Sequence, residues 1–228
     1  MRQPIRRAAS ALALAAGLLG CGGHHHLAEY SFTDRTLGLV YVTPPAPALR
    51  TGYHDASASG NPVTAVLQAS GDVAREVEAR RARVRLDSAA ARTNIPDVLA
   101  RRTVERAGRY LGMRPASRAD DADFVLEVQM RSFGIDVSRE SAAYLYSNAQ
   151  AVLLDRRTGR EIWSVAVNAH DRLTPFVDGP SGSSGVITAG TLRTVSVADF
   201  QQALDQLATL SSNRIADELR GALRDSRK

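Results

Sequence analysis

The chain has 228 residues, of which 44% are hydrophobic, 23% charged and 5% aromatic, an ordinary globular composition that argues against wholesale disorder. A single cysteine, Cys21, excludes an internal disulfide framework and a cysteine-rich zinc site. The formal net charge of +5 first suggests a nucleic-acid or membrane partner.

The N-terminal segment explains both the cysteine and part of the charge. Three arginines precede an apolar run over residues 8–19, which is too short to cross a bilayer but typical of a secretory signal. The run ends in Leu18-Leu19-Gly20-Cys21, which resembles the lipobox of bacterial lipoproteins. The resemblance implies a diacylglyceryl group on Cys21 and cleavage after Gly20. Because three arginines and no acid leave with residues 1–20, the charge falls to +2, and we expect no nucleic-acid partner.

The resemblance also implies where the protein resides. Two or more acyl chains hold a protein stably on a membrane, whereas one does not. Gly22 follows the cysteine where an aspartate would retain an enteric lipoprotein at the inner membrane, so we expect an outer-membrane protein facing the periplasm. We predict a signal peptide over residues 1–20, an acylated tether over 21–35 and one domain over 36–228. The tether includes His24, His25 and His26, whose adjacent side chains point in different directions and therefore favour a tether over a metal site.

Two candidate features precede the first long helix. Residues 36–43 read as a short strand that ends at prolines, and residues 51–62 as a loop, in which the His54–Asp55 pair has little specificity for catalysis. Residues 64–113 have a helical pattern whose apolar stripe is formed by four valines, Val66, Val73, Val77 and Val84. The arginine-rich stretch 75–85 indicates a solvated face with Glu–Arg pairs, or alternatively a site for anionic lipid or an acidic partner.

A second helix is expected from Pro96 to Leu111, with Gly112 marking its end. The acidic residues that follow, Asp120, Asp121 and Asp123, lack the spacing of a calcium loop and read as a polar turn before a strand.

Residues 122–169 carry the clearest strand signals. Apolar and polar residues alternate over residues 124–131, over 144–154 and over 161–169, and a Thr158-Gly159 turn joins the last two segments. The short links predict an antiparallel meander. Residues 174–190 form a Gly- and Ser-rich loop without a phosphate-binding or nucleophile-elbow motif, so we expect a surface loop that is open to partner contact.

The capping pattern formed by Ser196 and Asp199 predicts the start of a C-terminal helix. An apolar face then continues over about 25 residues and is expected to pack across the sheet. We therefore predict an α+β fold, an antiparallel sheet of three or four strands covered by helices that include this long amphipathic one.

The order of lipobox, strand, helices, meander and C-terminal helix resembles the small α/β lipoproteins of the bacterial envelope. Residues 122–223 carry the likeness, with an Asp-x-x-Thr-Gly hairpin at residues 155–159 and Trp163 after it. The group includes auxiliary lipoproteins of ABC-type lipid transport, the curli-secretion lipoprotein and activators of penicillin-binding proteins. The resemblance implies a non-enzymatic accessory or partner-binding protein, with no cofactor, no metal and no catalytic residue.

Two other functions stay open from the sequence. An envelope hydrolase would need His170 and Asp171 to meet a distant serine in a cleft. A lipid carrier would need a continuous apolar cavity of several hundred Å³ between the sheet and the helices, about the size of a common ligand site.

Overall fold

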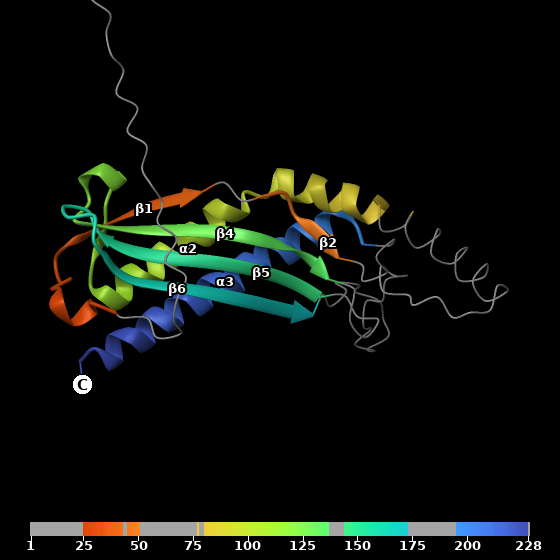
Figure 1. The fold of residues 1–228 in the computed structure, drawn as a ribbon. Helices are drawn as coiled ribbons and strands as arrows, with labels where there is room; N and C mark the ends of the chain where they lie inside the picture. The colour runs from red at the N-terminus through yellow and green to blue at the C-terminus, as the bar shows by residue number, and fades with distance from the viewer. Residues whose placement is uncertain are drawn as a thin grey trace, which may run out of the picture.

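The computed structural model describes residues 25–42, 45–50, 77, 80–136, 144–172 and 195–227. It has two layers, a mixed sheet and a set of helices that cover one face of that sheet (Figure 1). Several predicted features lie outside the described residues: the signal segment 1–20, Cys21, His24, two members of the valine stripe (Val66 and Val73) and the loops over 51–62 and 174–190.

The sheet has six strands, of which the first three in the chain are short and the last three are long. They are β1 (Thr36–Val42), β2 (Ala48–Arg50), β3 (Arg114–Pro115), β4 (Phe124–Asp136), β5 (Tyr144–Asp155) and β6 (Glu161–Arg172). Their order is β3-β1-β4-β5-β6, and β2 also pairs with β4. The meander β4-β5-β6 is antiparallel, as its alternation predicted.

The prediction of a purely antiparallel sheet of three or four strands is wrong. Strand β1 runs parallel to both β3 and β4, and β2 runs parallel to β4. Parallel neighbours need a long crossover connection. Here α2 lies between β1 and β4 in the chain, so these pairings join residues that no short-range pattern links.

Both long helices begin and end where the sequence indicates. Helix α2 (Ile95–Leu111) starts at Asn94, whose side chain accepts a hydrogen bond from the Asp97 N–H, and ends at Gly112 with φ +70°. Helix α3 (Val197–Asp225) starts with a reciprocal capping box between Ser196 and Asp199. Two 3₁₀ turns complete the described elements, η1 (Leu27–Glu29) and η3 (Ala119–Asp121).

The core lies between the inner face of the sheet and these helices. Trp163, Leu126 and Leu153 of the sheet are at most 1% exposed, as are Phe200 and Leu207 of α3. One polar pair is buried among these apolar side chains: the hydroxyl oxygens of Ser147 in β5 and Ser211 in α3 are 2.6 Å apart. Ser211 also donates to the carbonyl of Leu207, so Ser147 is the donor within the pair.

The helical residues 80–92 pack by a different face from the predicted one. Val77 and Val84, two members of the expected stripe, are 43% and 62% exposed. The buried positions are Ala82, Leu86 and Ala89, whose spacing of four and three places them on another side of the helix. One leucine between two alanines forms this contact, so the valine pattern misidentified the packed face.

The expected tether overlaps the folded body. Leu27 and Phe32 are 2% and 7% exposed, and the Phe32 ring meets that of Phe124 edge-on at 5.2 Å between centroids. Packing therefore begins before residue 36. In the described part of the chain, no helix combines the length and apolar character needed to cross a membrane.

Candidate functional site

The N-terminal segment joins the body beside the edge strand β6. The backbone N–H of His26 donates to the carbonyl oxygen of Ile162 at 2.9 Å. The side chains of Glu29 and Arg160 hold the same point, because Arg160 Nη1 lies 2.7 Å from Glu29 Oε2. The fold thus fixes where the chain that leads back to Cys21 leaves the surface.

His26 completes this cluster and contacts both charged partners. Its Nδ1 lies 2.7 Å from Glu29 Oε1 and 2.8 Å from Arg160 Nη2. A protonated Nδ1 donates to Glu29, whereas an unprotonated Nδ1 accepts from Arg160. The hydrogen bond from His26, followed by that from Arg160, lowers the pKa of the Glu29 carboxyl. Glu29 in turn raises the pKa of Arg160, and both side chains stay charged at neutral pH.

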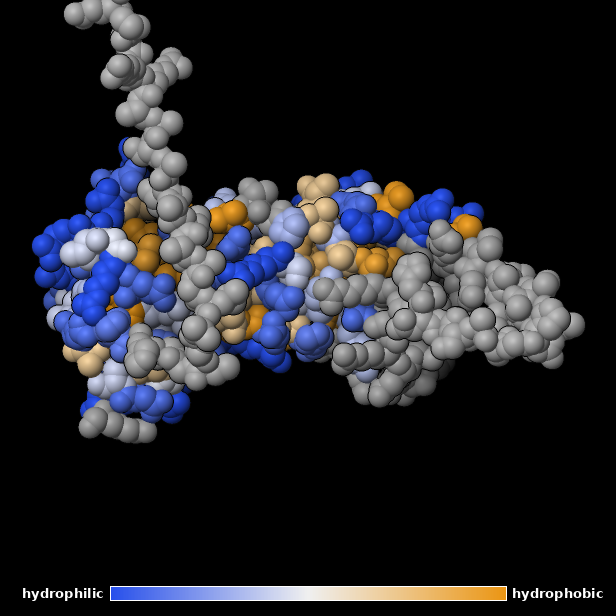
Figure 2. Space-filling model, in the orientation of Figure 1, coloured by the Kyte–Doolittle hydropathy of each residue, from blue (hydrophilic) through white to orange (hydrophobic). Residues whose placement is uncertain are grey.

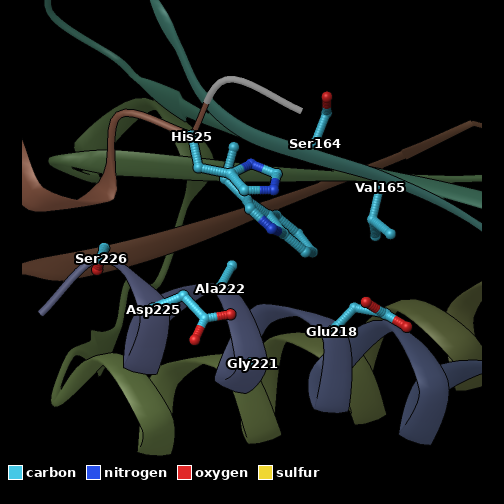
Figure 3. Close-up of a pocket in the computed structure, with 9 residues that line it drawn as sticks. His25, Ser164, Val165, Glu218, Gly221, Ala222, Asp225 and Ser226 are labelled. Carbon is cyan, nitrogen blue, oxygen red and sulfur yellow. The ribbon is translucent and has the colours of Figure 1, made fainter. Parts of the chain in front are cut away.

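A hollow of about 420 Å³ adjoins this exit, between β6 and the last turns of α3. Figure 3 shows His25 and Val165 on the β6 side and Glu218 and Asp225 on the helix side, while the Ser164 hydroxyl at the same wall is directed away from the helix. The His25 ring lies 6.4 Å from that of Trp163, between centroids. The lining therefore combines an imidazole, two carboxylates and hydroxyl groups beside one large indole.

The hollow has no evident catalytic or metal-binding arrangement. Over the described residues, no group of three His, Cys, Asp or Glu side chains is placed to hold a metal ion. Of the predicted histidine cluster, His25 faces the hollow and His26 turns to Glu29 and Arg160, so adjacent side chains do diverge.

The residues of the hydrolase alternative are not assembled at His170. That side chain is exposed on β6, whereas the alternative requires it to be buried beside an acid and a serine. The side chain of Asp171 and both members of the His54–Asp55 pair lie outside the described residues.

The acidic turn has a structural function at Asp123. The Asp123 carboxylate accepts from the backbone N–H and the hydroxyl of Thr36, each at 2.8 Å, and its own N–H donates back to that hydroxyl at 2.9 Å. These bonds, with a smaller effect of Arg35, lower the pKa of Asp123. They join the first residue of β1 to the residue before β4, which explains how two distant segments start in register.

A second hollow, of about 580 Å³, lies between helical residues 80–92, the start of α2 and residues 45–47. Its volume is within the range of ligand sites. Its lining includes the ion-paired side chains of Arg83 and Asp87 as well as Arg92, so it is not the continuous apolar cavity that a lipid carrier requires.

The sheet has one edge at β6 and another at β1. At β6, the guanidinium of Arg214 in α3 donates to the carbonyl of Asn168, in addition to the His26 contact at Ile162. At β1, β3 pairs only with Thr36 and Leu37. Beyond these residues β1 presents an unpaired edge within the described part of the chain. Its three last residues are large and exposed: Val40, Tyr41 and Val42.

The sequence did not predict the residues that fix the N-terminal segment to the body. Glu29 and Arg160 are 131 positions apart, and Trp163 and Glu218 also come from separate elements. The Thr158-Gly159 turn located the hairpin that carries Arg160, but no sequence signal paired that arginine with the tether.

No protein-family model matches the chain, and no curated protein matches it. Among solved structures, a candidate lipoprotein from Caulobacter crescentus is 16% identical over 58% of this chain and 85% of that one, with a TM-score of 0.36. A Xanthomonas campestris protein of the DUF330 family is 15% identical over 86% and 89%, with a TM-score of 0.36. Lipoprotein GNA1162 from Neisseria meningitidis is 14% identical over 81% and 99%, with a TM-score of 0.24.

Proposed function

We propose that the protein is a lipid-anchored, non-enzymatic component of the bacterial envelope that binds a partner protein in transport or biogenesis. The observation that carries the proposal is the Leu18-Leu19-Gly20-Cys21 sequence after a basic start and a short apolar run. The anchor is a thioether-linked diacylglyceryl group on Cys21, together with an acyl chain such as palmitate. The outer membrane, with the body in the periplasm, is the location that Gly22 favours.

The surface entry of the N-terminal segment supports this assignment. His26 is bonded to the edge of the sheet rather than buried beneath it, so the preceding residues can lead directly to an acylated cysteine. The partner-binding role draws support from the unpaired end of β1, because an exposed apolar strand edge is able to add a strand from another protein.

The anchor is tested with Cys21→Ser, which removes the thiol and hence the lipid. We expect the variant to move from the membrane fraction to the soluble periplasmic fraction, and the acyl mass to be absent from its N-terminus. Gly23→Ser is the matched control, because it makes a similar change two residues away and keeps the thiol. Retention of Cys21→Ser in the membrane fraction, or an unmodified Cys21 on a full-length wild-type chain, would refute the proposed anchor.

A further inference from the structure

The distance between the anchor and the body is limited by the chain itself. His26 is fixed to the body through its N–H, and Cys21 lies five residues before it. Even a fully extended chain of this length spans at most about 18 Å. By comparison, the 13 residues of β4 extend over about 43 Å. If Cys21 carries the lipid, the surface around His26 cannot move far from the membrane, whereas the opposite end of the sheet can.

We define the exit end as η1, the β5–β6 turn at residues 156–160 and the last turn of α3 at residues 222–226. Figure 1 shows these segments together at the end of the molecule where α3 finishes, and helical residues 80–92 at the other end. Most of the residues visible at this end in Figure 2 are hydrophilic, with some apolar ones among them. Helix α3 contacts η1 directly, so the three segments of the exit end form one continuous surface around His26.

The exit end carries exposed charges of both signs. Arg157 and Arg224 form no ion pair within the described residues, and Arg227, just past the defined turn, forms none there either. An exposed carboxylate, that of Glu161, follows the β5–β6 turn at the same end. Arginine binds phosphate through paired N–H groups, and a carboxylate accepts hydrogen bonds from a primary ammonium. A phosphatidylethanolamine head group carries both of these partners.

The open face of the sheet is a poorer match for a membrane. Arg131 and Glu127 lie on that face of β4 and offset each other in charge, and the Arg131 guanidinium donates to Gln150. Lying flat would place a Glu127 carboxylate and an already bonded Arg131 against lipid, whereas standing on the exit end places there arginines without an ion pair in the described part of the chain.

We infer that the body stands on its exit end, with Arg157, Arg224 and Arg227 at the level of the phospholipid head groups and helical residues 80–92 directed away. This inference rests on the proposed lipid anchor at Cys21. The occupant of the exit end is therefore the lipid surface itself, and the partner-binding end of β1 and the far end of the sheet stay accessible to proteins.

The test measures the depth of two labelled positions in the full lipidated chain. Thr158→Cys labels the β5–β6 turn and Val84→Cys labels the helix at the far end; both side chains are exposed. Because Cys21 is the chain's only cysteine and is acylated, each variant has one free thiol for a fluorophore. The labelled proteins are reconstituted into vesicles of phosphatidylethanolamine and phosphatidylglycerol that include a lipid with a nitroxide on its head group.

We expect several-fold stronger quenching at position 158 than at position 84. Equal quenching at the two positions, or stronger quenching at position 84, would overturn the inference. The same labels on the Cys21→Ser background should lose this difference, since the chain is then no longer held. Mass spectrometry and vesicle retention of the wild-type chain are read first, and a chain without lipid would refute the anchor itself. An acylated, retained chain with uniform quenching would refute only the orientation.

Discussion

At the β6 edge, two backbone carbonyls accept hydrogen bonds from other parts of the chain, at Ile162 from His26 and at Asn168 from Arg214. At the opposite edge, the end of β1 pairs with β4 on one side, has no strand on its outer side within the described residues, and exposes Tyr41 and Val42 by 43% and 50%. Free strand edges promote association, and proteins commonly cover them with charged side chains. The edge of β6 is thus partly covered by hydrogen bonds from other segments, whereas the last residues of β1 leave an apolar edge exposed.

The β1 side depends on close backbone contacts that only glycine permits. Gly134 in β4 has φ +153° and pairs with Ala48 of β2, and an added Cβ would lie 1.8 Å from the Ala48 carbonyl oxygen. We expect Gly134→Ala to lower the free energy of unfolding by about 3 kcal/mol, measured by urea denaturation, because backbone must move.

Gly221→Ala is the control for that substitution. Gly221 lies in α3 with no atom within 4 Å of an added Cβ, so alanine should raise the free energy of unfolding by about 0.5–1 kcal/mol. Equal losses of unfolding free energy in the two variants would show that the close approach of β2 to β4 is not the reason that position 134 requires glycine.

The start of β1 is attached to β4 through an ionised carboxylate. In the folded protein the pKa of Asp123 is lowered, so its contribution to stability is complete above the ordinary carboxyl pKa and is lost as the pH falls through the folded value. Asp123→Asn should therefore lower the thermal midpoint at neutral pH, by less than Gly134→Ala does. The difference from the wild type should shrink in acid.

The control for the carboxylate is Asp121→Asn. Asp121 is exposed in the adjacent turn η3 and forms no ion pair within the described residues, so its replacement should leave the thermal midpoint nearly unchanged at each pH. If both variants lost stability equally and at all pH values, the Thr36–Asp123 bonds would not be the source of the effect.

The protection of β6 is tested with Arg214→Ala, which removes the hydrogen bond to the Asn168 carbonyl. The free energy of unfolding should fall by less than about 1 kcal/mol, because the arginine is exposed. The freed edge should instead increase concentration-dependent association, measured by light scattering on the non-lipidated chain. Arg220→Ala, which removes a different arginine of α3 together with its cation–π contact to Tyr110 of α2, should not do so. Association of both variants to the same extent would assign the effect to lost charge.

Local signals predicted most of the elements. Pro96 lies in the first turn of α2 and Ser196 caps α3, as predicted, and Gly112 takes the left-handed conformation that ends α2. The cap at Asn94 was not predicted. The alternation in residues 144–154 placed the inner face of β5 correctly, because period-two burial depends on adjacent residues alone.

The remaining features depend on contacts between distant segments. The parallel pairing of β1 with β4 depends on the Thr36–Asp123 bonds and on η3 closing over Gly38, where an added Cβ would lie 2.8 Å from Ala119 Cα. The ion pair between Glu29 and Arg160, which holds the N-terminal segment to the body, likewise joins residues far apart in the chain. Hydrophobic spacing also assigned Val84 to the packed face wrongly, because two of the three residues on the true contact face, Ala82 and Ala89, are alanines and give a weaker hydrophobic pattern than valines.

The buried hydroxyl pair between β5 and α3 has a consequence for the uniqueness of the fold. The apolar stripe of α3 repeats with every turn, so a shift of the helix along the sheet by one turn, about 5.4 Å, would still bury leucines and alanines. That shift would separate Ser147 from Ser211, leaving the Ser147 hydroxyl without its acceptor at a cost of about 1–3 kcal/mol. This buried polar contact thus favours a single longitudinal position for the 29-residue helix, which contacts between apolar side chains would specify less strongly.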